Sequence, residues 1–254
     1  MKSLACYSIK GGVGKTAAAS VLAYLAAQQG KRVLLWDLDP QGAATFCFRV
    51  KPKTRGGAKK LLHGKRDPAS LVRGTDYEGL DLLRAHFAFR NMDRILDETR
   101  KPTRQLGRLI RPLAREYDWL IFDCPPGITL SAEAVFFAVD ALLVPTVPTT
   151  LSLRALEQLH WYLRRKGPSN LRVLPFLSMV DGRKSLHRQV CQQAAALPFG
   201  FLASHVPYAS EVEQMAVRRT PLPAYARSSR ATRAFAALWD EVQVALKTPA
   251  KRRK

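Results

Sequence analysis

Residues 10–16 read Lys-Gly-Gly-Val-Gly-Lys-Thr, a run whose residue types and spacing suit phosphate binding. In the pattern G-x-x-x-x-G-K-[ST], backbone N–H groups of a glycine-rich turn surround phosphates at the positive N-terminus of the next helix. Gly14, Lys15 and Thr16 close that pattern, and the Thr16 hydroxyl is suited to ligate Mg²⁺. The run follows apolar residues and precedes an alanine-rich stretch, so we expect a strand, a phosphate loop and a helix in that order.

A second lysine, Lys10, stands at the entrance of this loop. It lies too far back to share the role of Lys15 on the same β- and γ-phosphates. A lysine at this position makes chemical sense if it reaches a nucleotide bound in another subunit.

Carboxylates stand at the ends of two further apolar runs. Residues 33–36 lead into Asp37 and Asp39, and residues 119–122 lead into Asp123. In doubly wound sheets, ligands bind beyond the carboxyl ends of the strands, so these carboxylates and the lysine-threonine pair should meet in one crevice. That combination predicts Mg²⁺-dependent nucleotide hydrolysis.

These motifs together resemble the ParA/MinD family of ATPases with a deviant Walker A sequence, and more closely its small ParA (Soj-like) branch. The resemblance continues through most of the chain. Its landmarks are Asp39-Pro40-Gln41-Gly42, Asp123-Cys124-Pro125-Pro126, Leu142-Leu143-Val144-Pro145, Leu151-Ser152-Leu153, and, late in the chain, residues 178–183 and 205–208. One departure is the run of alanines at 17–19, where the family often has more threonines.

The resemblance implies a role for each motif residue. Lys15 is expected to bind the phosphates, Thr16 to ligate Mg²⁺, and Asp123 to hold a water on that ion. Lys10 is the family's signature lysine, which crosses a nucleotide-sandwich dimer to the partner's phosphates, and Asp39 positions or activates the attacking water. The expected catalytic residues are thus Lys10, Lys15 and Asp39, with ATP and Mg²⁺ as cofactors.

Asp37 has two interpretations, as a metal ligand near Thr16 and Asp123 or as a strand-end residue that hydrogen-bonds the following loop. The complete set of expected nucleotide-binding residues is Gly11, Gly12, Val13, Gly14, Lys15, Thr16, Ala17 and Pro207.

The 254 residues carry 41 Lys and Arg against 20 Asp and Glu, a net charge of +21, which points to a polyanionic partner. The excess is concentrated in residues 49–115 (+11) and 210–254 (+6). In the first block, Arg104, Arg108, Arg111 and Arg115 recur at helical spacing opposite an apolar face, although Pro112 should bend or shorten that helix.

The second basic block lies where ParA proteins bind DNA without sequence preference. Arg218, Arg219, Arg230 and Arg233 are therefore the DNA-contact candidates. Residues 247–254 are expected to form a basic tail that follows a single ATPase domain of residues 1–246.

Strand-like runs at about 3–9, 32–36, 80–84, 118–123, 141–145, 171–178 and 201–206 alternate with helical patterns. This alternation predicts an α/β fold with a mostly parallel twisted sheet and helices on both faces. The four cysteines show no C-x-x-C spacing and are interpreted as reduced cytoplasmic thiols.

The leading functional hypothesis is a cytoplasmic, nucleoid-associated ATPase that dimerises on ATP, binds nonspecific double-stranded DNA and positions a cargo. A ParB-like or cargo-adaptor protein is the expected activator. Two alternatives remain open: a MinD-like membrane switch, and a metabolic enzyme on the same scaffold. Since residues 247–254 contain only Pro249 and Ala250 as apolar groups, stable membrane insertion is not expected.

Overall fold

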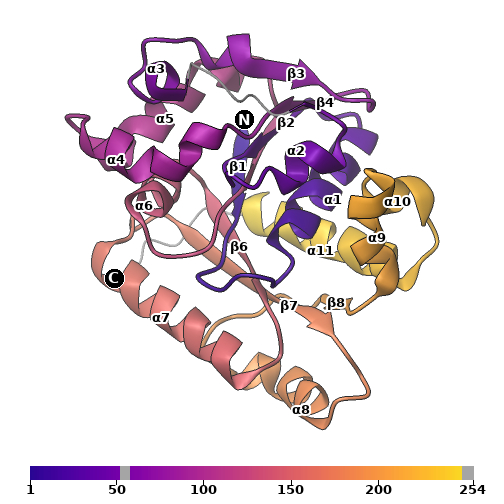
Figure 1. The fold of residues 1–254 in the computed structure, drawn as a ribbon. Coiled ribbons are helices and arrows are strands. Elements are labelled where there is room, and N and C mark those ends of the chain that lie inside the picture. The colour runs from indigo at the N-terminus through magenta and orange to yellow at the C-terminus, as the bar shows by residue number, and fades with distance from the viewer. Residues whose placement is uncertain (52–57, 248–254) are drawn as a thin grey trace.

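The computed structural model describes residues 1–51 and 58–247 (Figure 1). In this part of the chain, eight strands form one sheet in the order β3-β4-β2-β5-β1-β6-β7-β8. Neighbouring strands run parallel except for β3, which pairs with β4 in the antiparallel sense. The strands are β1 (Lys2–Cys6), β2 (Val33–Asp37), β3 (Val72–Gly74), β4 (Leu80–Leu83), β5 (Trp119–Asp123), β6 (Ala141–Thr146), β7 (Arg172–Val180) and β8 (His205–Pro207).

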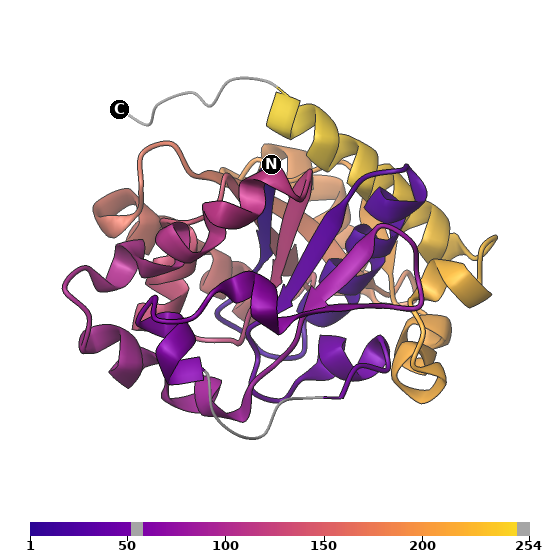
Figure 2. The same cartoon turned by 90° about the horizontal axis from the view of Figure 1, so that it is seen from above.

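Helices cover both faces of the sheet, as Figure 1 and the view from above in Figure 2 show. One face packs against α3 (Ala58–Leu62), α4 (Met92–Asp97), α5 (Gln105–Ile110), α6 (Leu130–Phe136) and α7 (Thr150–Lys166). The other packs against α1 (Lys15–Gln28), α2 (Ala43–Cys47), α9 (Ser210–Arg218), α10 (Leu222–Tyr225) and α11 (Arg230–Lys247). Helix α8 (Ser185–Gln193) packs beside β7 through Val190.

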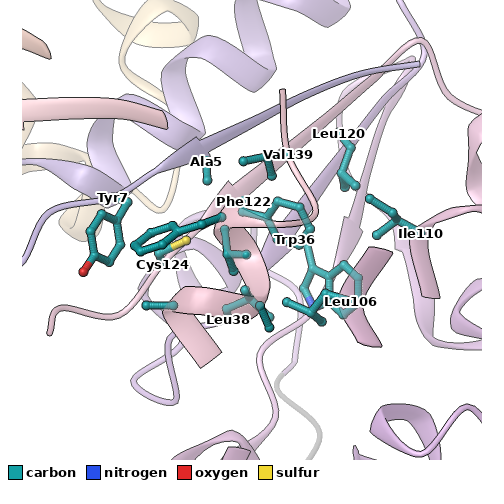
Figure 3. Packing of buried hydrophobic residues seen from close by; sticks show 14 of the residues in the cluster. Ala5, Tyr7, Trp36, Leu38, Leu106, Ile110, Leu120, Phe122, Cys124 and Val139 are labelled. Atoms are coloured by element: carbon teal, nitrogen blue, oxygen red, sulfur yellow. The ribbon is translucent and has the colours of Figure 1, made fainter. Parts of the chain in front are cut away.

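The central strands are apolar along their whole length because both faces of the sheet are covered. All five residues of β2 and of β5 are buried. Their aromatic side chains Trp36 and Phe122 stack with ring centroids 5.3 Å apart, and Figure 3 shows them at the centre of one core with Leu106 and Ile110. This packing fixes β2 and β5 side by side, so their terminal aspartates lie next to each other.

The predicted fold class is confirmed. The region expected to be one helix at 103–116 is instead the short helix α5 between two 3-10 turns, and the second of these turns begins at Pro112. Arg104, Arg108, Arg111 and Arg115 are exposed there, as the predicted arginine face requires. Two elements differ from the sequence-based expectation: β3, which is the antiparallel edge strand, and α2, which follows the acidic end of β2, were not predicted.

In the part of the chain that the structure describes, no helix has the length and apolar character needed to cross a bilayer. Residues 248–254 of the predicted basic tail lie outside the described residues, and Lys247 is the last residue of α11.

Candidate nucleotide-binding site

The glycine-rich loop connects β1 to α1 and has the backbone conformation that its glycines permit. Gly12 and Gly14 adopt positive φ values of 69° and 94°. A Cβ atom at Gly14 would also lie 3.1 Å from Ser178 Oγ, which is tighter than ordinary contact. The loop therefore requires glycine at position 14 both for its backbone angle and for the close approach of β7.

A cavity of about 550 Å³ opens over this loop at the carboxyl ends of the central strands. Its lining includes seven of the eight predicted nucleotide-binding residues, from Gly11 to Ala17, and it adds Asp39, Gln41 and Pro126. Gln41 and Pro126 were absent from the predicted set, although each lies within three residues of a predicted aspartate. Pro207, at the end of β8, is not among the lining residues, and its role stays a prediction.

Lys15 is the first residue of α1 and is buried. Its Nζ donates to the backbone carbonyl of Lys10 at 3.3 Å, so the side chain folds back across the loop. Burial lowers the pKa of Lys15, and the nearby Asp123 carboxylate offsets part of that shift. The ammonium group is thus held at the phosphate loop with a carboxylate close by.

The environment of the Asp123 carboxylate is suited to binding a cation. It is fully buried, and neither carboxylate oxygen has a hydrogen-bond partner among the described residues. Burial raises its pKa well above the usual range, the carboxylates of Asp37 and Asp39 raise it further, and Thr16 and Lys15 offset part of the rise. Because a buried unpaired carboxylate is costly, and because hard oxygen ligands suit Mg²⁺, Thr16 and Asp123 fit a magnesium ion held with its waters and the nucleotide phosphates.

Asp37 and Asp39 have different environments although they are two residues apart. Asp37 is buried, and its Oδ2 accepts hydrogen bonds from the backbone N–H and the hydroxyl of Thr45 at 2.8 and 2.7 Å. Its Oδ1 accepts from the backbone N–H of Asp39 at 3.2 Å. Asp39 is half-buried and lines the cavity. The geometry agrees with the loop-holding interpretation of Asp37, whose role as a metal ligand stays a prediction. Asp39 lines the cavity, and its catalytic role stays a prediction.

Lys10 points away from the loop that it precedes. Its Nζ donates to the hydroxyl of Ser152 at 3.2 Å, in the first turn of α7, and Ser152 also accepts from the hydroxyl of Thr149. Lys10 is not among the residues that line the cavity. Within one subunit, this lysine does not contact the phosphate loop through its side chain.

The four predicted DNA-contact residues lie on α9, α11 and the turn after α9. Arg218 ends α9 and lies over the ring of Tyr225, and Arg219 lies over the ring of Phe46. Arg230 and Arg233 are exposed in the first turn of α11. Both Figure 1 and Figure 2 show α11 starting beside α9 and α10, so the elements that carry the two pairs lie on one side of the molecule.

A second cavity, of about 950 Å³, shares no lining residue with the cavity over the phosphate loop. It contains none of the predicted site residues and is lined by His63, Gly64, Lys65, Arg66, Asp67, Pro68, Glu98, Thr99, Arg100, Gln105, Arg108, Leu109 and Pro112. The smaller cavity is the nucleotide site despite its lesser volume, because Lys15 and Thr16 of the phosphate loop line it together with Asp39.

A parallel sheet with a glycine-rich phosphate loop after β1 and acidic ends on β2 and β5 defines a P-loop nucleoside triphosphatase. Comparison with known proteins narrows this class. A family model described as an AAA domain matches residues 1–167. The sporulation initiation inhibitor protein Soj of Bacillus subtilis is 30% identical over 197 residues, which cover 76% of this chain and 78% of Soj. The chromosome partitioning protein ParA of Caulobacter vibrioides is 30% identical over 203 residues, which cover 77% and 76%.

The chain belongs to the ParA family of P-loop ATPases. Among solved structures, cobyrinic acid a,c-diamide synthase from Mycobacterium smegmatis, crystallised with ADP and magnesium, is 27% identical with a TM-score of 0.78. That similarity covers 100% of this chain and 99% of the synthase chain. The predicted family, fold and ATPase class are confirmed, and the predicted cofactors ATP and Mg²⁺ agree with the nucleotide and metal in that structure.

Proposed function

We propose that this protein is an ATPase that dimerises on ATP, binds double-stranded DNA without sequence preference and uses the nucleoid to position a cargo. The observation that carries the proposal is the combination of a ParA-type nucleotide site with four exposed or partly exposed arginines on one side of the molecule. Relatives named Soj and ParA, which cover about three quarters of the chain, support the same function.

Each residue of the site has a task in this proposal. Lys15 and the backbone N–H groups of the loop bind the phosphates, and Thr16 and Asp123 hold Mg²⁺, whose charge offsets that of the phosphates. Asp39 orients a water at the open side of the cavity, because phosphoryl transfer depends on positioning and electrostatics.

Lys10 leaves Ser152 and extends to the phosphates of the partner subunit, so each site is complete only in the dimer. Dimerisation also doubles the number of arginines that face DNA, and hydrolysis separates the subunits and weakens binding. An activating partner of the ParB or cargo-adaptor kind gives this release a direction, and the expected location is the cytoplasm, on the nucleoid.

Titration of fluorescent random-sequence duplex DNA at near-physiological salt, with ATP, ADP or no nucleotide, tests the proposal. Tight binding with ATP alone, lost in Lys15→Ala, supports it. Binding that ignores the nucleotide would show that the net charge acts by itself, and absence of binding in every state would overturn the proposal. Phosphate contacts also predict a steep decrease of affinity with salt.

The similarity to cobyrinic acid a,c-diamide synthase favours a second candidate, a ligase that uses ATP to activate a small carboxylic acid. The two candidates differ in what stimulates turnover. Duplex DNA together with an adaptor protein is expected to raise the ATPase rate of a positioning protein, whereas a ligase responds to an acid and an amine donor and not to DNA.

A further inference from the structure

A single segment of the chain, residues 37–49, borders both the nucleotide cavity and the turn at the end of α9. This turn, residues 218–220, contains Arg218 and Arg219 and is called the arginine turn below. At the start of the segment, Asp39 and Gln41 line the cavity. At its end, Phe46 and Arg49 contact residues 218–220, which lie about 170 positions further along the chain. Helix α2 forms the middle of this segment and packs directly on α9.

At the nucleotide end, the segment is tied together by hydrogen bonds. Asp37 accepts from Thr45 in α2 and from the backbone of Asp39, as described above. The backbone N–H groups of Gln41 and Gly42 donate to the side chain and the carbonyl of Asp39, both at 2.9 Å. Because these hydrogen bonds connect Asp39 to Thr45 through Asp37, a movement of Asp39 is expected to move α2 as well.

At the arginine end, the contacts are equally specific. Arg219 donates through Nε to the carbonyl of Phe46 at 3.0 Å while its guanidinium lies 4.5 Å from the centre of the Phe46 ring. Arg49 donates to the carbonyls of Arg219 and Arg218 at 3.2 and 3.4 Å and to the hydroxyl of Thr220 at 3.3 Å. The positions of both DNA-contact candidates in this turn thus depend on α2.

Arg49 and Arg219 also share an unusual backbone conformation. Their φ values are 58° and 50°, in the left-handed region that residues with a side chain seldom adopt. Both residues follow the end of a helix, where glycine usually takes this conformation, so the surrounding contacts must hold these two arginines in it. Each of these two arginines bonds to the segment that carries the other.

We infer that α2 couples the nucleotide site to the DNA surface, and that Arg49 and Phe46 are positioning residues for Arg218 and Arg219. The purpose of this coupling rests on the proposed DNA binding, but the coupling itself does not. A nucleotide that contacts Asp39 and Gln41 favours one position of α2. The contacts of Arg49 and Phe46 then move the arginine turn together with α2.

Hydrogen exchange of the full chain, followed by mass spectrometry, tests the coupling without DNA. We expect segments 43–49 and 215–221 to differ in protection between the states with Mg²⁺ and a non-hydrolysable ATP analogue and with Mg²⁺ and ADP. Arg49→Lys keeps the charge, and with it the attraction to Asp76, but loses the planar group that meets three acceptors in the turn after α9. Segment 43–49 should therefore still respond, while the response of 215–221 falls at least threefold. Arg227→Lys, the same change at an exposed position of α10's C-terminal loop, is the control and should match the wild type.

A wild-type protein in which 215–221 ignores the nucleotide would overturn the inference, and so would an undiminished response in Arg49→Lys. Phe46→Leu provides a second variant, because this half-exposed ring can be removed without opening the core. It should weaken the response of 215–221 in the same direction.

DNA titration then separates the two proposals. The ratio of DNA affinities with the ATP analogue and with ADP is expected to fall at least fivefold in Arg49→Lys, while nucleotide affinity is kept. If the nucleotide changes the protection of both 43–49 and 215–221 but no state binds DNA, the coupling stands and the proposed function fails. If DNA binding responds to nucleotide equally in the wild type and Arg49→Lys, the function stands and the inference fails.

Discussion

The hydroxyl of Ser178, at the end of β7, donates a hydrogen bond to the backbone carbonyl of Val13 in the phosphate loop at 2.9 Å. Ser178 is buried and lies two strands away from β1 in the sheet. The loop is therefore held from both sides, by its own strand and helix and by a side chain distant in the sequence.

Replacing Ser178 by Ala is expected to weaken ATP binding about fivefold to tenfold, because the change leaves the buried Val13 carbonyl unpaired and costs about 1 kcal/mol. Fluorescent-nucleotide titration measures this loss. Ser20→Ala is a matched control, since Ser20 is also buried but its hydroxyl has no partner among the described residues. Equal affinity of the two variants would contradict a role for Ser178 in holding the loop.

Lys10→Ala is expected to separate nucleotide binding from dimerisation. Because the Lys10 side chain contacts Ser152 rather than the phosphate loop, the variant monomer should bind ATP within about twofold of the wild type, whereas the ATP-dependent dimer is lost. Sedimentation velocity with a non-hydrolysable analogue measures the dimer. Lys15→Ala serves as the comparison and should lose both properties. A Lys10→Ala dimer of wild-type strength would exclude a role in the partner's site.

Asp39→Ala is expected to lower the ATPase rate about 100-fold or more, because a positioned carboxylate contributes about 10²–10⁴ to such reactions. ATP binding and the ATP-dependent dimer should persist, so the variant is trapped in its DNA-bound state. Steady-state phosphate release together with DNA retention measures both effects. Asp37→Asn should behave differently from Asp39→Ala. Asp37 accepts two hydrogen bonds from Thr45, so this substitution is expected to lower the free energy of unfolding as well as the ATPase rate.

Arg218→Ala combined with Arg219→Ala is expected to weaken DNA binding about tenfold or more and to reduce the salt slope by about 2, one for each lost phosphate contact. Basal ATP hydrolysis should be unchanged. The pair Arg230→Ala and Arg233→Ala tests the other half of the surface. A parallel loss of ATPase activity would mean that these arginines support the fold instead.

The ion pair between Arg32 and Asp118 predicts a pH dependence of stability. The Arg32 guanidinium lowers the pKa of Asp118 to about 2, and the two groups are 3.0 Å apart at the start of β2 and β5. A folded-state pKa below the usual value of 3.8 means that the pair stabilises the protein above about pH 4 and that this contribution disappears as the pH falls toward 2. The exposed position of the pair keeps the effect small, because solvent screens the interaction.

Urea unfolding of Asp118→Asn between pH 7 and pH 3 measures this contribution. The variant should be slightly less stable than the wild type at pH 7, and the difference should diminish as the pH falls below 4. A constant difference across this range would mean that the hydrogen-bonding shape of Asp118 matters rather than its charge.

The sheet and the nucleotide site could be predicted because their signals are local. Asp39 and Asp123 stand at the ends of apolar strands, and Lys15 and Thr16 close the glycine-rich loop that follows β1. Parallel strands bring their carboxyl ends to one edge of the sheet. Helix α5 was anticipated only in part, because a proline at 112 indicates an interruption without fixing where the helical turns begin and end.

The contacts that hold the site in place could not be predicted. Ser152 and Ser178 lie in landmarks of the family resemblance, but nothing in those landmarks indicates their hydrogen-bond partners. The partners, Lys10 and Val13, lie more than 140 positions away. Arg49 looked like one charge in a basic stretch, and only the folded chain brings it to residues 218–220. Such roles depend on tertiary packing and not on local spacing.

The buried carboxylate of Asp123 also affects the stability of the protein when no nucleotide is bound. Burial disfavours the charged form of this carboxylate in the empty protein, and Mg²⁺ bound with nucleotide favours that form, so binding also stabilises the fold. The resting subunit is then the most fragile form of the molecule. Its abundance in a cell, and its resistance to proteases, should follow the supply of ATP.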